Sequence, residues 1–522
     1  MVLGLDLVGP PDTTDATFVP GIMFDRIASL THPLRDNHWF YGALGVSAAL
    51  AAGWLIGTGG AVGVLMVVGI PVALLLVIGI LLEPKIGLLI YINLSFSLGL
   101  TRFVPSDAPL GLSIDGVIVL TLLSVFLNGK RMNWKRLRHP VFYMLVVWLC
   151  YTILEYFNPE APYRPAWFYH ARSFSLNWFY VAIIILVAPI TKADIRLLIK
   201  LWMVWSFLAA LWAFKQQYIG LEQAEIRWLV EGGNDKTHIL WGQLRSFSFY
   251  SDAAQFGAEM AGITLVCLIR VFEAKKWVVR LGFLALALVF FWGFAVSGTR
   301  SALFVLLAGF PAYLFLTRDM NRILTGAAVA APVLAILLFT HLGDSVYHIY
   351  RIRTALRPTE DASFLLRLEN QQKLRGYLKD LPFGAGIGSS ADTGSRFSPN
   401  HFAAQIPPDS WYVEIWIETG IVGLTLYLLM IAGIISFGTY KIWQIKDPWL
   451  RITMIAFLAE FIGIALMCYS NAILSQFPTS TILYITCILF TTCERWDTVV
   501  GEKPETGLRP IHSPNHESAL KS

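Results

Sequence analysis

The sequence predicts an all-α protein whose helices cross a membrane many times. Of the 522 residues, 56% are hydrophobic and only 14% are charged, whereas about one quarter of the residues of a soluble chain are charged. The mean hydropathy is +0.60, and apolar runs long enough to cross a bilayer recur along most of the length. These observations predict a polytopic bundle of about 12 to 14 transmembrane helices.

The positions of the apolar runs predict the individual spans. About fourteen are expected, at residues 39–58, 60–82, 86–103, 112–128, 141–157, 177–190, 200–219, 252–271, 281–297, 301–316, 323–340, 411–440, 452–472 and 479–493. The first 38 residues lack the basic start and apolar core of a cleavable signal peptide. The chain therefore divides into a cytoplasmic N-terminal segment (1–38), a transmembrane bundle (39–340), a periplasmic loop (341–410), C-terminal transmembrane helices (411–493) and a disordered cytoplasmic tail (494–522).

Basic residues in alternate loops predict the orientation of the bundle. They are Lys130, Arg131, Lys135, Arg136 and Arg138, then Lys192 and Arg196, Lys275, Lys276 and Arg280, Arg318 and Arg322, and Lys441, Lys446 and Arg451. By the positive-inside rule their side is cytoplasmic. The other side receives three long connections, residues 158–176, 220–251 and 341–410. Long loops are commonly functional, so we expect the site on that face, under a partly helical cap formed by the third loop.

Arg300 is the polar residue that fits the span pattern least. It lies in SGTRS (297–301), a break between two apolar runs that leaves room only for a tight turn. One interpretation is an arginine whose head group reaches the membrane interface. However, the predicted topology puts Arg300 on the outer side, where the positive-inside rule predicts few arginines. The sequence therefore favours contact with an anion, and a phosphate suits the planar guanidinium best.

A second arginine precedes another predicted span. Arg245 comes before SFSFYSDAAQF, in which Tyr250, Ser251 and Asp252 lead into the helix. Ser251 or Asp252 is expected to cap this helix. A helix N-terminus beside an arginine is also an anion-binding place, so a cap and a binding site are compatible here.

Three carboxylates lie where the longest predicted span begins, in PPDSWYVEIWIETGIVG (407–423). Glu414 and Glu418 are four residues apart and share one face of a helix, while Asp409 and Ser410 occupy the N-cap positions. In the simplest interpretation Asp409 caps the helix, Glu414 interacts with its dipole and Glu418 pairs with an arginine. Glu418 nevertheless lies deeper, among apolar residues, where a carboxylate is by default a functional candidate.

No metal, cofactor or nucleic-acid partner is expected. The cysteines lack CxxC spacing and lie in or beside apolar runs, so they predict neither a zinc site nor disulfides. They are Cys150, Cys267, Cys468, Cys487 and Cys493. The sequence has no clustered pattern of Asp, Asn and Glu that indicates a divalent site, and the net charge of +5 is modest.

These motifs resemble those of the O-antigen ligase and polymerase superfamily of bacterial envelope proteins. SGTRSA (297–302) is similar to the family's Ser-x-Ser-Arg-Gly-Ala turn, and Arg245 with FYSDAAQF is similar to its arginine before a span. PFGAG (382–386) is similar to the Pro-x-Gly-x-Gly segment of the family's periplasmic loop. Residues 408–423 resemble the motif Pro-His-Asn-Ser-Tyr-Leu-Glu-x-x-x-Glu-x-Gly-x-x-Gly, the most specific of these. The resemblance covers residues 245 to 440 approximately and implies a glycosyltransferase C-like architecture.

The resemblance also implies roles for individual residues. In the family two arginines hold the pyrophosphate of an undecaprenyl-linked glycan, and the matching residues here are Arg245 and Arg300. A histidine acts there as general base, but this chain has Asp409-Ser410 in place of the family's His-Asn. Asp409 can serve as the base if burial raises its pKa toward neutrality. His401 and Glu414 are the alternatives, and Glu418, Tyr250 and Arg367 are expected to support the site.

The expected function is that of an inner-membrane polysaccharide polymerase or ligase. It would transfer a glycan from undecaprenyl diphosphate to an acceptor hydroxyl on the periplasmic face, with the glycan donor, a glycan or lipid acceptor and membrane lipids as partners. The Asp-for-His change slightly favours an exopolysaccharide polymerase or a lineage-specific variant, although polymerisation and ligation share donor and motifs. The alternatives are a flippase or other secondary transporter, which would favour internal repeats and midplane charges, and a catalytically inactive scaffold.

Overall fold

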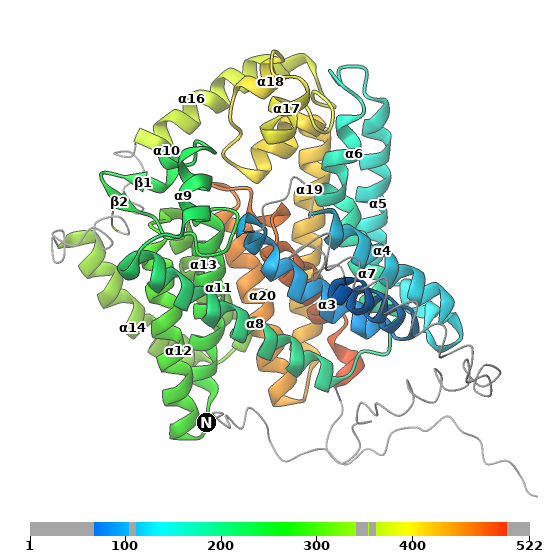
Figure 1. Ribbon diagram of the computed structural model, residues 1–522. Helices are drawn as coiled ribbons and strands as arrows, with labels where there is room; N and C mark the ends of the chain where they lie inside the picture. Colours follow the sequence, from blue (N-terminus) through cyan, green and yellow to red (C-terminus); the bar gives the residue numbers. More distant parts are fainter. Residues whose placement is uncertain (1–66, 104–110, 341–352, 354–361, 498–522) are drawn as a thin grey trace, which may run out of the picture.

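The structure is a computed structural model that describes residues 67–103, 111–340, 353 and 362–497 (Figure 1). After an apolar helix, Val67–Leu82, the α-helices are α3 (Pro84–Ser97), α4 (Leu112–Leu127), α5 (Pro140–Leu154), α6 (Ala166–Ala171), α7 (Asn177–Val187), α8 (Lys192–Phe214), α9 (Gln223–Val230), α10 (Asp235–His238), α11 (Ala253–Glu273), α12 (Trp277–Val296), α13 (Leu303–Thr317), α14 (Met320–Phe339), α16 (Ala362–Tyr377), α17 (Ala391–Phe397), α18 (Phe402–Gln405), α19 (Trp411–Gln444), α20 (Pro448–Met467) and α21 (Thr479–Thr491). Strands β1 (Ile239–Leu240) and β2 (Gln243–Leu244) pair as a short antiparallel hairpin.

The prediction of an all-α polytopic membrane protein is confirmed. Among the described residues, nine helical segments are long and apolar enough to cross a membrane, and three shorter apolar helices accompany them. They correspond to most of the predicted spans, while the predicted span 39–58 lies outside the described residues. The helix predicted in the long loop from its leucine spacing is present as α16.

One predicted outer loop is wrong in part. Residues 166–176 were expected in the polar connection before the span at 177–190, but they continue that span as α6 and a π-helical turn, so that Ala166–Val187 forms one candidate span. The reason is aromatic packing: Phe174 stacks on Trp148 with ring centroids 5.4 Å apart and meets Trp411 at 5.3 Å. Burial of these rings orders the segment although its sequence contains polar residues.

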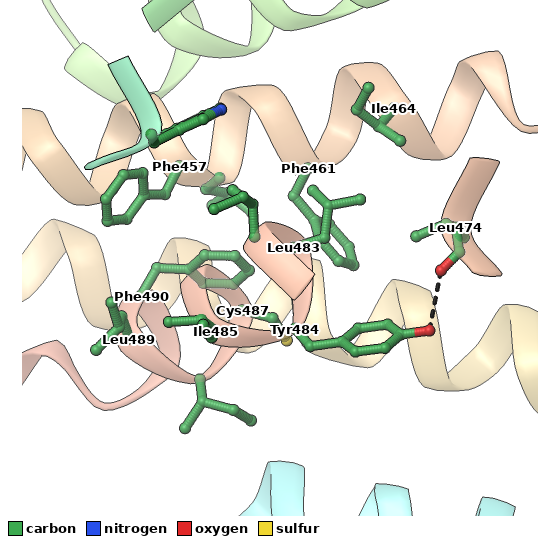
Figure 2. Packing of buried hydrophobic residues seen from close by; sticks show 14 of the residues in the cluster. Phe457, Phe461, Ile464, Leu474, Leu483, Tyr484, Ile485, Cys487, Leu489 and Phe490 are labelled. Atoms are coloured by element: carbon green, nitrogen blue, oxygen red, sulfur yellow. Dashed lines mark hydrogen bonds between the residues drawn. The ribbon is translucent and has the colours of Figure 1, made fainter. Parts of the chain in front are cut away.

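The centre of the bundle is formed by α11, α20 and α21. Most residues of these helices are buried, which is unusual for spans that face lipid on one side. Figure 2 shows Phe457 and Phe461 of α20 beside Leu483 and Phe490 of α21, in a cluster of large apolar side chains. This buried centre gives the N-terminus of α11, where Asp252 accepts a hydrogen bond from the Gln255 backbone N–H, a fixed position.

The two ends of the bundle differ in their charge and cover. Ion pairs join basic loops to one another at one end: Lys85–Asp194 at 2.8 Å, Lys192–Asp447 at 2.7 Å and Lys441–Glu494 at 2.9 Å. We call this the basic end. In Figure 1, α16, α17 and α18 lie together at the top of the molecule, and we call the end that they cover the capped end.

Helix α19 is broken at Gly420, close to the capped end. Gly420 has φ 65°, and a Cβ there would lie 2.0 Å from the Pro382 carbonyl oxygen, so only glycine fits. The loop that begins at Pro382 provides hydrogen-bond partners for backbone groups at the break. Ala385 N–H donates to Ile417 O, and Val422 N–H donates to Pro382 O. The long loop is thereby attached to the first turns of α19.

Candidate functional site

A cavity of about 710 Å³ opens at the capped end, and we call it the arginine cavity. Arg245 lines it from the segment before α11, Arg300 from the turn before α13, Arg367 from α16 and Asp409 from the segment before α19. Four of the residues predicted for the site therefore line one space, although Arg245 and Arg300 are 55 positions apart in the sequence.

The turn before Arg300 holds the side chain of Arg245. Its guanidinium donates from Nε to Ser297 O at 3.1 Å and from Nη2 to Thr299 Oγ1 at 3.0 Å, and a third bond runs from Nη1 to Thr237 O at 2.8 Å. Gly298 has φ 58°, and a Cβ there would lie 3.2 Å from Arg245 Cγ. The SGTR sequence thus orients one arginine and carries the next.

Cations outnumber carboxylates among the lining residues. Lys236, Arg245, Arg300 and Arg367 contribute positive charges, against Asp409 and the capping Asp252. His238 also lines the cavity, and burial lowers its pKa. Its Nε2 accepts a hydrogen bond from the Ala253 backbone N–H at 3.2 Å, which fits a neutral ring. The lining has the charge expected of an anion-binding site.

Asp409 faces this cavity and does not cap α19. The cap is Ser410, whose Oγ accepts from the Val413 backbone N–H, so the expectation of a capping Asp409 is wrong. Asp409 has φ 51°, a left-handed conformation that Asp tolerates better than most residues. Partial burial raises the pKa of Asp409, and the positive charge of Arg367 opposes that rise.

Glu414 and Glu418 do not line the arginine cavity. They share one face of α19, as their spacing predicts, but that face meets His170 of α6. His170 Nε2 lies 3.2 Å from Glu414 Oε1 and 3.4 Å from Glu418 Oε2, and all three side chains are buried. We call these three residues the His–Glu cluster. The prediction of a catalytic Glu414 beside the arginines is therefore not supported by its position.

Two other predicted residues lie elsewhere. His401 precedes α18, its Nε2 is 3.3 Å from Tyr377 Oη, and it is not among the residues that line the arginine cavity; burial lowers its pKa. Tyr250 lines a neighbouring cavity of about 410 Å³ together with Arg102 and Trp228. His401 packs against Tyr377 of α16, and Tyr250 lines the cavity beside Trp228 of α9. Neither residue is among those that line the arginine cavity.

Sequence reasoning missed residues that the fold brings to these sites. His170 has no spacing relation to Glu414 or Glu418, and it lies within an aromatic segment that was predicted as loop. Lys236 and Asn471 line the arginine cavity from segments that carry no recognisable motif. Only the pairing of chain segments in three dimensions reveals these neighbours.

Fold and cavity together define a multi-pass membrane protein with an arginine-lined cavity at its capped end. Residues 285–428 match the family model described as O-antigen ligase. The resemblance read from the motifs is thus confirmed for this segment, which holds Arg300, Arg367 and Asp409 but not Arg245. The match supports the similarity of this segment to the O-antigen ligase and polymerase superfamily. No curated protein matches the chain.

Proposed function

We propose that the protein transfers a glycan from an undecaprenyl-diphosphate carrier to an acceptor hydroxyl on the periplasmic face of the inner membrane. The observation that carries this proposal is the convergence of Arg245, Arg300 and Arg367 with Asp409 on one cavity. A diphosphate is a compact anion with several acceptor oxygens, and planar guanidinium groups bind it with directed hydrogen bonds.

The arginines would act on the leaving group. During transfer, the bond between the anomeric carbon of the glycan and the phosphate oxygen breaks, and its electron pair stays with the diphosphate. Negative charge therefore grows on the bridging oxygen as the bond lengthens. Arg245, already oriented by the turn at 297–299, would stabilise that charge without rearranging, and Arg300 lines the same cavity and would share it.

Asp409 would act on the acceptor. As the acceptor oxygen bonds to the anomeric carbon, its proton must leave, and the Asp409 carboxylate can accept it. The raised pKa of Asp409 makes it a stronger base than an ordinary aspartate, and the positive charge of Arg367 limits the rise. The geometry favours Asp409 over His401 and Glu414, because it alone of the three lines the cavity.

The position of the accumulated donor tests this proposal against a flippase. A bacterial strain without the protein should accumulate the lipid-linked glycan, and in spheroplasts this glycan should be open to an added glycosidase, because transfer follows translocation. Accumulation on the protected, cytoplasmic leaflet would instead support the transporter. The length of the accumulated glycan separates the two transferases: single repeat units indicate a polymerase, and finished chains indicate a ligase. The Asp-for-His change leads us to expect single units.

A further inference from the structure

The His–Glu cluster is a second polar site, distinct in its residues from the arginine cavity. His170 comes from α6, and Glu414 and Glu418 come from the first turns of α19. Their exposed fractions are 9%, 4% and 0%, so the cluster is almost closed to solvent. One nitrogen and two carboxylate oxygens, one from each residue, all lie within 4.8 Å of one another.

Two of the three separations between these atoms are those of ligands around a common centre. Three ligand atoms bound tetrahedrally to a cation at about 2.0 Å are separated by about 3.3 Å from each other. The Nε2–oxygen separations of 3.2 and 3.4 Å match that edge. Moreover, among the described residues neither His170 Nε2 nor Glu418 Oε2 makes a hydrogen bond of regular geometry, although both atoms are buried and lie at ion-pair distance from each other. The contacts therefore have the length of a ligand edge but lack the direction of a hydrogen bond.

In Glu418 and His170, the side-chain atom that does not face the cluster contacts a neighbouring residue. Glu418 Oε1 accepts from the Ser390 backbone N–H at 3.2 Å and from Ser390 Oγ at 2.9 Å, which leaves Oε2 directed at the cluster. His170 Nδ1 lies 3.3 Å from Thr393 Oγ1, a contact that orients the ring so that Nε2 faces the glutamates. Metal sites typically fix their histidine and carboxylate ligands in this way.

The charge of the cluster is compatible with a cation. With both glutamates ionised, a protonated His170 leaves one net negative charge in a closed space, which a proton on one glutamate would also remove. Two glutamates, a neutral imidazole and a divalent cation sum to zero, which removes the cost of a buried uncompensated charge. One imidazole with two carboxylates suits a first-row cation. Zinc takes four ligands, of which the cluster would supply three and a water the fourth.

We propose that His170 Nε2, Glu414 Oε1 and Glu418 Oε2 bind a divalent first-row cation, for which Zn²⁺ is the probe. The ion joins α6 to the first turns of α19. Through Ser390 it also holds the loop that follows Pro382, so its role is to fix the capped end. The site shares no residue with the arginine cavity, and the inference does not depend on the transfer reaction.

Metal content of the purified full-length protein tests the proposal. The protein is purified in detergent through an affinity tag that contains no histidine, and its metal is removed with a chelator. It is then incubated with Zn²⁺ and desalted, and its zinc content is measured by mass spectrometry. We expect about one zinc per chain for the wild type and less than about one tenth for His170→Gln and Glu418→Gln. His139→Gln and Glu460→Gln are matched controls, which remove a histidine and a buried glutamate outside the cluster and should bind as the wild type does.

Two further measurements guard against variants that fail to fold. Chelator should lower the thermal unfolding midpoint of the wild type, and Zn²⁺ should restore it. Ser390→Ala keeps all three ligands and should weaken zinc binding about 10- to 100-fold. A wild type that retains no zinc and whose midpoint ignores chelator overturns the proposal and leaves a protonated His170 between two glutamates. Equal zinc in the wild type, His170→Gln and Glu418→Gln overturns it too.

Discussion

The arginine cavity and the His–Glu cluster both receive residues from the segment 409–418, and yet they differ in size and in the charged groups that they contain. Asp409 lines a cavity of about 710 Å³ in which cations outnumber carboxylates, whereas Glu414, five residues later, enters a closed cluster in which carboxylates outnumber cations. Space and the balance of charged groups together bear on the ligand: the open cavity, in which cations outnumber carboxylates, suits a large anion, and the closed cluster, in which carboxylates outnumber cations, suits a small cation. The acidic residues of one motif therefore need not share a role.

The largest expected effect is all-or-none labelling of single cysteines, which tests on which side of the membrane the capped end lies. In a background with Cys150→Ser, a cysteine at the exposed Ser395 of α17 should react with a membrane-impermeant reagent in spheroplasts, because the proposed topology places the capped end in the periplasm. A cysteine at Lys276, in the basic loop before α12, should react only after lysis. The reverse pattern would remove both the topology and a periplasmic transfer site.

Asp409→Asn should reduce transfer about 10²- to 10⁴-fold, because an amide cannot take the proton of the acceptor hydroxyl. Folding should be preserved, since Ser410 caps α19 and Asn tolerates the left-handed backbone. Asp392→Asn on α17 is the matched control and should transfer normally, because Asp392 is not among the residues that line the cavity. Normal transfer by Asp409→Asn would eliminate Asp409 as the base.

The pH dependence of Asp409 gives a signed test. Its pKa is raised by burial, so the acid limb of the transfer rate should lie above the ordinary carboxyl range near about pH 4 and should disappear in Asp409→Asn. The contribution of Asp409 to the free energy of unfolding should change in the opposite direction and fall as the pH rises. A carboxyl whose folded pKa exceeds its unfolded pKa contributes stability that is present below the unfolded pKa and is lost as the pH rises through the folded pKa. Parallel pH profiles of rate and unfolding midpoint measure both signs.

Arg300→Lys should reduce transfer about 100-fold at unchanged expression, because lysine keeps the charge but loses the planar pair of donors. Arg131→Lys, at the basic end, changes the same side chain in the same way and should have no measurable effect. Turnover of purified protein in proteoliposomes gives the comparison. Full activity of Arg300→Lys would reduce Arg300 to an interfacial anchor.

The smallest expected effect is that of His401→Gln, which should change transfer less than about twofold because the ring is packed beside Tyr377 and does not line the arginine cavity. Its unfolding midpoint is the control, since loss of a partly buried ring should still register there. A loss of transfer as large as that of Asp409→Asn would move the base to His401 and contradict the assignment from geometry.

The sequence predicted the parts of this account that depend on local pattern. The apolar runs gave the spans, the tight SGTRS turn singled out Arg300, and the four-residue spacing put Glu414 and Glu418 on one face. The sequence could not say what that face meets, because His170 is brought to it by the packing of α6 against α19. The N-cap was misassigned for a similar reason: Asp and Ser cap equally well, and the left-handed backbone of Asp409 settles the choice for Ser410.

Direct binding of undecaprenyl diphosphate to the purified protein tests the central claim, that the arginine cavity binds the diphosphate of the donor. The double variant Arg245→Ala, Arg300→Ala should bind this carrier at least about 100-fold more weakly than the wild type, because the fixed charge-assisted hydrogen bonds are lost. A double variant at the basic end, Arg131→Ala with Arg138→Ala, should bind it as the wild type does. Equal binding by the wild type and the cavity variant, with both proteins folded and monodisperse, would contradict the account.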